Sequence, residues 1–270
     1  MQTYCVILAA GNSRRFDKNK DKLFTNIYGS KLISFTLINI LKIFNKSNVF
    51  IVIHKDLSIT NQKFLKSFTT NNLIKGGETR FKSFKKAIKL FNEDANILIH
   101  DAARPNINIG LIKKIKKEIE KNNIYSVIPY NNISDTLKIN KSSKYKTVSR
   151  SQFITTQTPQ AIKLDIKTRK IIKDLKSDIT DESAIFDGSN LKTSYTKGSN
   201  ENIKVTNKKD VQLIKKFIGH NIRIGNAFDI HKITQGSFLS LGGIKFKSKY
   251  SLVGHSDGGV VIHSLIAVSY

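Results

Sequence analysis

Val6-Ile-Leu-Ala-Ala-Gly-Asn-Ser-Arg-Arg-Phe16, continued as far as Lys22, is the stretch around which the chain is organised. Its first residues, 6–8, predict a buried apolar strand, and Ala9, Ala10 and Gly11 leave the backbone bare where that strand ends. Five basic residues follow at once: Arg14, Arg15, Lys18, Lys20 and Lys22. A bare turn with dense positive charge behind it suits a polyphosphate, whose oxygens accept from main-chain N–H groups. A strand that runs into a basic surface loop is the alternative.

Length and composition indicate a globular protein of one large domain or two smaller ones. The chain has 270 residues, of which 39% are hydrophobic and 24% charged. No run approaches the roughly 18 apolar residues of a membrane span, and the N-terminus lacks a signal-peptide pattern. A single cysteine, Cys5, excludes a disulfide framework and a thiolate metal cluster. We therefore expect a cytoplasmic protein with no membrane partner.

The formal net charge of +26 raises the possibility of a nucleic-acid-binding protein. The lysines are scattered over every predicted helix, however, and no aromatic residues interleave with them as a base-stacking platform requires. This distribution favours a general compositional bias. We expect nonspecific polyanion binding at low salt and no specific nucleic-acid partner, and keep the nucleic-acid-binding class as an alternative.

Strand and helix patterns alternate along most of the chain. Predicted strands cover residues 6–8, 49–53, 73–75, 97–99 and 125–129. Predicted helices cover residues 31–44, 62–68, 80–91, 109–121, 165–175, 181–186 and 208–218. Repeated β-α-β units of this length predict an α/β fold with a doubly wound parallel sheet.

Two segments depart from this alternation. Residues 135–139 and 147–149 predict a two-stranded hairpin with little core of its own, which must pack on the parent domain or on a second subunit. Residues 219–221 mark a boundary, after which residues 222–270 form a short C-terminal part. About 50 residues is marginal for an independent core, so we expect this part to be an incomplete domain.

Three features fall at the carboxyl ends of predicted strands, where open α/β sheets bind ligands. They are the loop 9–22, the turn 76–83 and the run Asp101-Ala-Ala-Arg104-Pro105. An acid at a strand end opposite an Arg/Lys loop can hold a divalent metal against phosphates. The alternative for Asp101 is a helix N-cap or turn residue. The sequence contains no Walker, G-x-G-x-x-G or G-x-S-x-G pattern, which argues against P-loop NTPases, dinucleotide oxidoreductases and nucleophile-elbow hydrolases.

Several motifs occur in a fixed order. They are Ala9-Ala-Gly11 with Arg15 and Lys22, Gly76-Gly77-x-x-Arg80-x-x-Ser83, His100-Asp-Ala-Ala-Arg-Pro105, Asp135-Thr136, Thr158-Pro-Gln160, Thr180-Asp-Glu182 and Asn202-Ile-Lys-Val-Thr206. With them, residues 1–218 resemble the 2-C-methyl-D-erythritol 4-phosphate cytidylyltransferases of non-mevalonate isoprenoid synthesis. The resemblance implies a Rossmann-like nucleotidyltransferase sheet with a protruding β-hairpin arm. A related ribitol 5-phosphate cytidylyltransferase shares this architecture and is the alternative.

The resemblance also implies a reaction and its residues. A phosphate oxygen of the acceptor attacks the α-phosphorus of CTP, and pyrophosphate leaves. Arg15, Lys22 and Lys204 would be the catalytic cations, and Asp101 would help to hold Mg²⁺. The nucleotide would be bound by Ala9, Ala10, Gly11, Gly77, Ser83, Asp101 and Ala102.

Methylerythritol phosphate would be held by Arg104, Thr136, Arg150 and Thr158. In this family Thr136 and Arg150 lie on the hairpin arm and reach a neighbouring subunit, so the resemblance implies a homodimer. Two positions depart from the family pattern. Ser13 replaces the usual second glycine of the first loop, and Asp21 replaces the proline that often precedes the loop lysine.

The C-terminal part carries a second resemblance. Arg223-Ile-Gly-Asn-Ala-Phe-Asp229-Ile-His231 and Gly254-His-Ser-Asp-Gly-Gly-Val-Val-Ile-His263 are similar to the start of 2-C-methyl-D-erythritol 2,4-cyclodiphosphate synthase, which is fused to the cytidylyltransferase in some bacteria. Asp229, His231 and His263 would form a three-ligand Zn²⁺ site. Gly259 stands where that family usually has an aspartate, and the resemblance covers only the first part of the domain. We expect weak or absent metal retention and no cyclase turnover.

Overall fold

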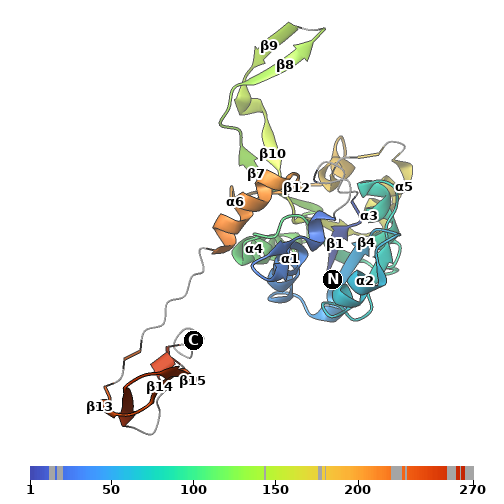
Figure 1. The fold of residues 1–270 in the computed structure, drawn as a ribbon. Coiled ribbons are helices and arrows are strands. Elements are labelled where there is room, and N and C mark those ends of the chain that lie inside the picture. Colours follow the sequence, from blue (N-terminus) through green and yellow to red (C-terminus); the bar gives the residue numbers. More distant parts are fainter. Residues whose placement is uncertain are drawn as a thin grey trace. The chain divides into compact units, whose positions relative to one another are not determined.

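The computed structural model describes residues 1–11, 16, 21–142, 144–175, 178–179, 181–219, 227–228, 230–253, 260–261 and 263–264. The chain divides into two compact units, Met1–Ile218 and Gly219–Tyr270. The first unit is an α/β sheet structure with helices on both faces (Figure 1). The second contains short paired strands.

The first unit is built on a central sheet, in which eight strands take part among the described residues. They are β1 (Gln2–Ala9), β4 (Val49–Ile53), β5 (Leu73–Lys75), β6 (Ala95–Asp101), β7 (Ser126–Asn132), β10 (Ile154–Thr156), β11 (Gln160–Leu164) and β12 (Thr193–Lys197). The order across the sheet is β10-β7-β11-β6-β1-β4-β5, and β12 lies off this path and pairs in parallel with β7. Strand β1 therefore lies near the middle and directs its end toward the predicted phosphate loop.

The predicted parallel arrangement is confirmed for the strands around β1. Strand β1 pairs in parallel with β4 and β6, so that Val6 lies beside Phe50 and Ile99. Strand β11 differs, because it runs antiparallel between β6 and β7. The chain reaches β11 from β7 through the hairpin arm and β10, without a helical crossover, and such a return reverses the strand direction. Strands β10, β11 and β12 were not predicted from the sequence.

The helices agree with the predicted segments, with shifted ends. They are α1 (Leu32–Leu41), α2 (Ile59–Lys66), α3 (Arg80–Ile88), α4 (Ile109–Ile119), α5 (Ile166–Asp174) and α6 (Lys208–Gly219). Short 3₁₀ turns are η1 (Lys22–Phe24), η2 (Lys46–Asn48), η3 (Arg150–Gln152) and η4 (Glu182–Phe186). Helix α2 begins earlier than predicted because the Ser58 side chain caps it, accepting from the N–H of Asn61. The predicted helix 181–186 is the 3₁₀ turn η4.

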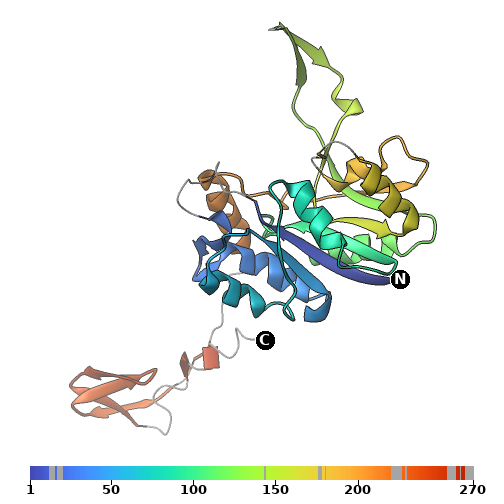
Figure 2. The same cartoon turned by 90° about the vertical axis from the view of Figure 1, so that its right-hand side faces the viewer.

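Two apolar layers, one on each face of the sheet, confirm the doubly wound fold. Alternate residues of β1 divide between them: Cys5 and Ile7 join the layer under α1, α2, α4 and α6, whereas Val6 joins the layer under α3, α5 and η4. Burial on both faces explains why β1 reads as a continuous apolar run. Figure 2 shows helices on both faces of the sheet.

A hairpin of β8 (Leu137–Lys141) and β9 (Lys144–Val148) stands away from the sheet in both views (Figures 1 and 2). Its side chains are largely exposed, including Ile139 at 46% and Tyr145 at 68%. The predicted protruding arm, which has no core of its own, is therefore confirmed. A second, two-residue ladder pairs β2 (Asn26–Ile27) with β3 (Ser30–Lys31).

The second unit contains two antiparallel pairs. Strand β13 (Lys232–Gln235) pairs with β16 (Tyr250–Val253), and β14 (Phe238–Leu241) pairs with β15 (Ile244–Lys247). Most of residues 222–228 and most of residues 254–270 lie outside the described residues. Among the residues with assigned positions, no helix is long and apolar enough to cross a membrane.

We expect Phe84→Ala to destabilise the first unit. Phe84 is fully buried in the layer under α3, and its ring stacks on Phe81 with the centroids 6.0 Å apart. Removing the ring leaves a cavity and should lower the free energy of unfolding by about 3–5 kcal/mol in denaturant titrations. Leu90→Ala is the matched control, because that side chain is 54% exposed and its loss should change stability by less than about 0.5 kcal/mol. Equal effects would contradict this assignment of the core.

Candidate active site

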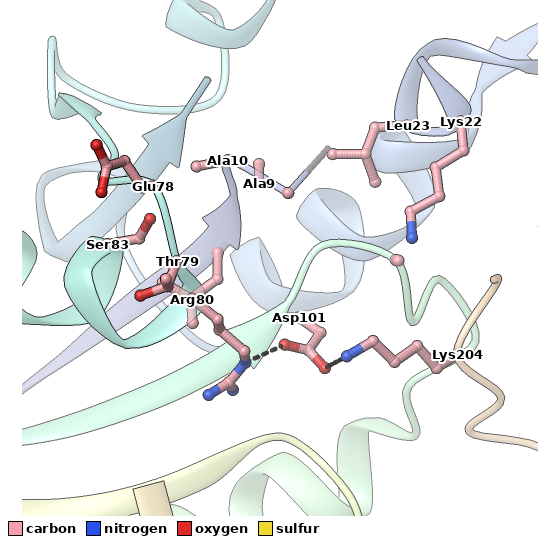
Figure 3. A pocket seen from close by; sticks show the side chains of 13 residues that line it. Ala9, Ala10, Lys22, Leu23, Glu78, Thr79, Arg80, Ser83, Asp101 and Lys204 are labelled. Carbon is pink, nitrogen blue, oxygen red and sulfur yellow. Dashed lines mark hydrogen bonds and ion pairs between the residues drawn. The ribbon is translucent and has the colours of Figure 1, made fainter. Parts of the chain in front are cut away.

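A cavity of about 260 Å³ opens where β1 and β6 end. Its wall is formed by residues 8–11 at the end of β1, the start of α3, the acid that ends β6, and lysines from two other segments. Figure 3 shows Lys22, Arg80, Asp101 and Lys204 around this space. The three features that the sequence placed at strand ends therefore meet in one cavity.

The bare turn after β1 packs closely on the glycine turn that precedes α3. A Cβ on Gly76 would lie 2.4 Å from the Cβ of Ala10, and one on Gly77 would lie 2.6 Å from the Cβ of Lys82. The hydroxyl of Ser83 accepts from the N–H of Gly77 at 3.0 Å and so holds the turn against the helix. Glycine is required at both positions, because a side chain on Gly76 would push the turn away from Ala10 and one on Gly77 would clash with Lys82 of α3.

Asp101 lies at the end of β6 with its side chain only 9% exposed. Its Oδ1 accepts from Nε of Arg80 at 3.0 Å, and its Oδ2 lies 2.8 Å from Nζ of Lys204 and 3.7 Å from Nε of Arg104. Burial by itself would raise the pKa of Asp101, but the charges of Arg80, Lys204 and Arg104 outweigh it and hold the pKa well below its usual range. Its backbone carbonyl accepts from the N–H of Arg104, as in a turn. The carboxylate itself is ionised and faces cations.

Arg104 and Thr158 lie behind Asp101 and connect it to the segment that carries Lys204. Arg104 donates to the carbonyl of Asn202 at 2.7 Å, and the Asn202 amide donates to the carbonyl of Thr158 at 2.8 Å. The Thr158 hydroxyl accepts from the N–H of Asp101 at 3.0 Å. This network holds the Asp101 backbone close to the segment that carries Lys204.

His100, the residue before Asp101, is a fully buried neutral imidazole. Burial lowers its pKa to about 4. Its Nε2 lies 3.1 Å from the carbonyl of Arg104, and its Nδ1 lies 3.2 Å from the Thr158 hydroxyl. Because a carbonyl can only accept, Nε2 carries the ring proton and Nδ1 accepts. His100 therefore orients its neighbours and carries no charge at neutral pH.

The two lysines enter from segments far apart in the sequence. Lys22 begins η1 and donates to the carbonyl of Val205 at 3.0 Å. The N–H of Val205 donates in turn to the carbonyl of Ala103 at 2.8 Å, which joins the Lys204 segment to the turn after β6. Asp21, which departs from the family pattern, caps η1 by accepting from the N–H of Leu23 at 3.0 Å.

Arg80 and Glu182 are part of this cluster, although sequence reasoning did not select them as site residues. Arg80 donates through its two terminal nitrogens to the two oxygens of Glu182, at 2.6 and 2.8 Å. Both residues occur in the motifs that carry the family resemblance, and that was the available signal. Their contact joins segments 102 residues apart, so the sequence alone did not indicate the pair.

Other predicted residues fall outside the cavity wall. Ala102 is fully buried, with its N–H bound to the carbonyl of Leu8. Thr136 and Arg150 belong to the arm, where both are exposed and Arg150 donates to the carbonyl of Ser134. Arg15 and Ser13 lie outside the described residues.

The predicted Mg²⁺ site and the predicted Zn²⁺ site differ in how many of their residues the structure describes. Asp101 and Glu78 are the carboxylates that line the cavity among the described residues, and Mg²⁺ is often held by one or two carboxylates together with phosphate oxygens. The donor type of Asp101 therefore fits Mg²⁺. In the second unit, Asp229 lies outside the described residues, whereas His231 and His263 lie within them. Within the described part of the chain, no group of three His, Cys, Asp or Glu side chains could hold a metal ion.

Comparison with known proteins gives matches to both parts of the chain. The family model for 2-C-methyl-D-erythritol 4-phosphate cytidylyltransferase matches residues 3–220, and that of the YgbB family matches residues 222–268. A curated relative from Pelagibacter ubique, named bifunctional enzyme IspD/IspF, is 33% identical over 98% of this chain and 69% of its own length. A relative of the same name from Rhizobium leguminosarum is 29% identical over 96% of this chain and 68% of its own length.

Solved structures agree with these matches. The bifunctional IspDF of Campylobacter jejuni has a TM-score of 0.64 and 26% identity, over 99% of this chain and 69% of that chain. The 4-diphosphocytidyl-2C-methyl-D-erythritol synthase of Anaerococcus prevotii has a TM-score of 0.67 over 81% of this chain and 98% of that one; at 22% identity it shows the fold alone. Taken with the cavity and its ordered motifs, the match over residues 3–220 shows that the chain belongs to the 2-C-methyl-D-erythritol 4-phosphate cytidylyltransferase family.

Proposed function

We propose that this chain transfers the cytidylyl group of CTP to 2-C-methyl-D-erythritol 4-phosphate and releases pyrophosphate. The observation that carries the proposal is the Asp101 carboxylate, buried among Arg80, Arg104 and Lys204 beside a cavity closed by the bare turn after β1. Family membership supplies the substrates. The arrangement of a buried acid, several cations and exposed main chain suits a metal-bound triphosphate.

The chemistry requires charge neutralisation and no general base. The attacking phosphate oxygen is already an anion at neutral pH, forms a bond to the α-phosphorus, and displaces pyrophosphate as the bond to the bridging oxygen breaks. Lys22 and Lys204 would bring the two anions together and stabilise the charge that develops on the α-phosphate, and Arg15 would join them from the first loop. The residues of the bare turn and Ser83 would bind the nucleotide, with Gly77 and Ala102 shaping the backbone around it.

Asp101 would hold Mg²⁺ when the nucleotide is bound. The ion would supply further positive charge at the phosphates. In this structure Lys204 occupies the Oδ2 side of Asp101, at 2.8 Å. Because the Lys204 side chain is 37% exposed, it can turn toward a phosphate when the nucleotide arrives.

Methylerythritol phosphate would be bound by Arg104 and Thr158 together with Thr136 and Arg150 of an arm. The arm extends away from the sheet of its own subunit and exposes Ile139 and Tyr145, which favours a homodimer in which each arm reaches the partner's site. The division into a cytidylyltransferase domain at 1–218, a linker at 219–221 and a partial cyclodiphosphate synthase domain at 222–270 is part of the same proposal. A Zn²⁺ site at Asp229, His231 and His263 stays a prediction.

The reaction is tested by incubating the full chain with CTP, Mg²⁺ and either methylerythritol 4-phosphate or ribitol 5-phosphate, and measuring pyrophosphate. We expect release with methylerythritol 4-phosphate. Release with ribitol 5-phosphate alone would assign the related activity. No release with either acceptor would refute the proposal.

Lys204→Ala should abolish most of the activity without unfolding the protein. Removing a cation that stabilises charge in the transition state lowers the rate by about 100- to 1,000-fold. Lys209→Ala is the matched control, because that lysine lies exposed on α6 close by in the sequence. Pyrophosphate release measures the rate, and the melting temperature checks folding. A Lys204→Ala rate within threefold of the unaltered chain would contradict the assigned role.

Mixing two inactive variants tests the arm. Arg150→Ala removes a group supplied by the arm, and Lys204→Ala removes a group supplied by the body of the subunit. If the arm serves the partner's site, random mixed dimers contain one intact site, so refolding the two variants together should restore about a quarter of the activity. Each variant refolded alone is the control. Activity that stays at the level of the separate variants would show that no site is shared.

A further inference from the structure

Glu182 is a fully buried carboxylate that faces the guanidinium of Arg80. Both of its oxygens accept, at 2.6 and 2.8 Å from the two terminal nitrogens. An ionised carboxylate without a partner in such a place is strongly destabilising, so Glu182 depends on the guanidinium of Arg80. Glu182 does not line the cavity, whereas Arg80 does.

Arg80 carries its positive charge at the N-terminal end of α3, where the helix dipole disfavours a cation. It is the first residue of α3, whose first turn contains no acid, and the N-terminal end of a helix carries partial positive charge. A cation there is electrostatically unfavourable. Two carboxylates from distant segments offset this cost, Asp101 from β6 and Glu182 from η4. A residue that its own helix disfavours, and that contacts with distant segments stabilise, is typical of functional sites.

The two oxygens of Asp101 have partners of different kinds (Figure 3). Oδ1 binds Nε of Arg80, a group that is held from its other end by Glu182. Oδ2 lies 3.7 Å from Nε of Arg104 and binds Lys204, whose side chain is 37% exposed and lies in a segment without helix or strand. Arg80 is therefore fixed on Oδ1, whereas Lys204 can be exchanged on Oδ2.

We infer that Glu182 is a positioning residue of the site: by holding Arg80 it keeps the guanidinium on Oδ1 of Asp101 and leaves Oδ2 for the metal–nucleotide complex. The inference rests on the proposed function. Without the Glu182 charge, Arg80 loses its second anchor. Its guanidinium is then free to leave Oδ1 and to compete with Lys204 for Oδ2 of Asp101. Asp101 is then less available to a divalent cation that arrives with CTP.

A purely structural ion pair between η4 and α3 is the competing explanation. It predicts that loss of Glu182 lowers stability and leaves the response to Mg²⁺ unchanged. The positioning role predicts a change in the Mg²⁺ dependence of nucleotide binding, even where stability is restored. The two explanations are therefore separated by measuring binding and stability on the same variants.

Glu182→Gln in the full chain is the first test. CTP binding is measured by calorimetry without acceptor, at increasing Mg²⁺ concentrations. Loss of a group that orients a metal ligand typically weakens metal binding by about 10- to 100-fold, so the Mg²⁺ concentration that half-saturates CTP binding should rise by that factor. Glu118→Gln is the matched control, because it removes an acid of α4 that pairs with Lys121. An unchanged Mg²⁺ dependence in Glu182→Gln would overturn the inference.

The double variant Arg80→Met with Glu182→Met separates positioning from folding. Replacing both members leaves no unpaired charge at Glu182, and Asp101 keeps Lys204 and Arg104 as partners, so stability is typically preserved. We expect a melting temperature close to that of the unaltered chain, together with a raised Mg²⁺ concentration for half-saturation of CTP binding. Restored stability with unaltered Mg²⁺ dependence would assign the pair a structural role only. Failure of the unaltered chain to bind CTP would instead refute the proposed function itself.

Discussion

The candidate site depends on one buried negative charge at the end of β6. Asp101 is ionised although its side chain is almost fully removed from water, because Arg80, Lys204 and Arg104 surround it. Each cation comes from a different segment: the start of α3, the turn after β6, and the stretch before α6. The requirement to neutralise a single carboxylate thus brings three parts of the chain to one edge of the sheet.

Close packing supplies the second constraint. The contact between Gly76 and Ala10 brings the glycine turn against the end of β1 without intervening side chains, so main-chain groups border the cavity. The departure at Asp21 fits the same design, since its side chain caps the 3₁₀ turn that carries Lys22. A proline in that position would fix φ but could not accept a hydrogen bond with its side chain.

Local patterns were sufficient for much of the fold. The runs at 49–53 and 73–75 became strands with the predicted limits, because strands buried on both faces are apolar throughout. Strand β11 was not recognised, since Gln160 and Lys163 interrupt its apolar pattern. Both polar side chains are buried and find partners only in the folded chain: Gln160 at Asp181, and Lys163 at the carbonyls of Lys121 and Asn122.

The sequence by itself determined the α/β class, the protruding arm and the set of motifs that assigns the family. It also indicated Asp101, Lys22 and Lys204, because charged residues at predicted strand ends and in ordered motifs can be recognised from the sequence alone. Only the tertiary structure decided which charges meet. Arg80 and Glu182 lie 102 residues apart, and their contact exists only because η4 and α3 pack on the same face of the sheet. Pairing between distant residues is set by the packing of whole elements, and no local pattern encodes it.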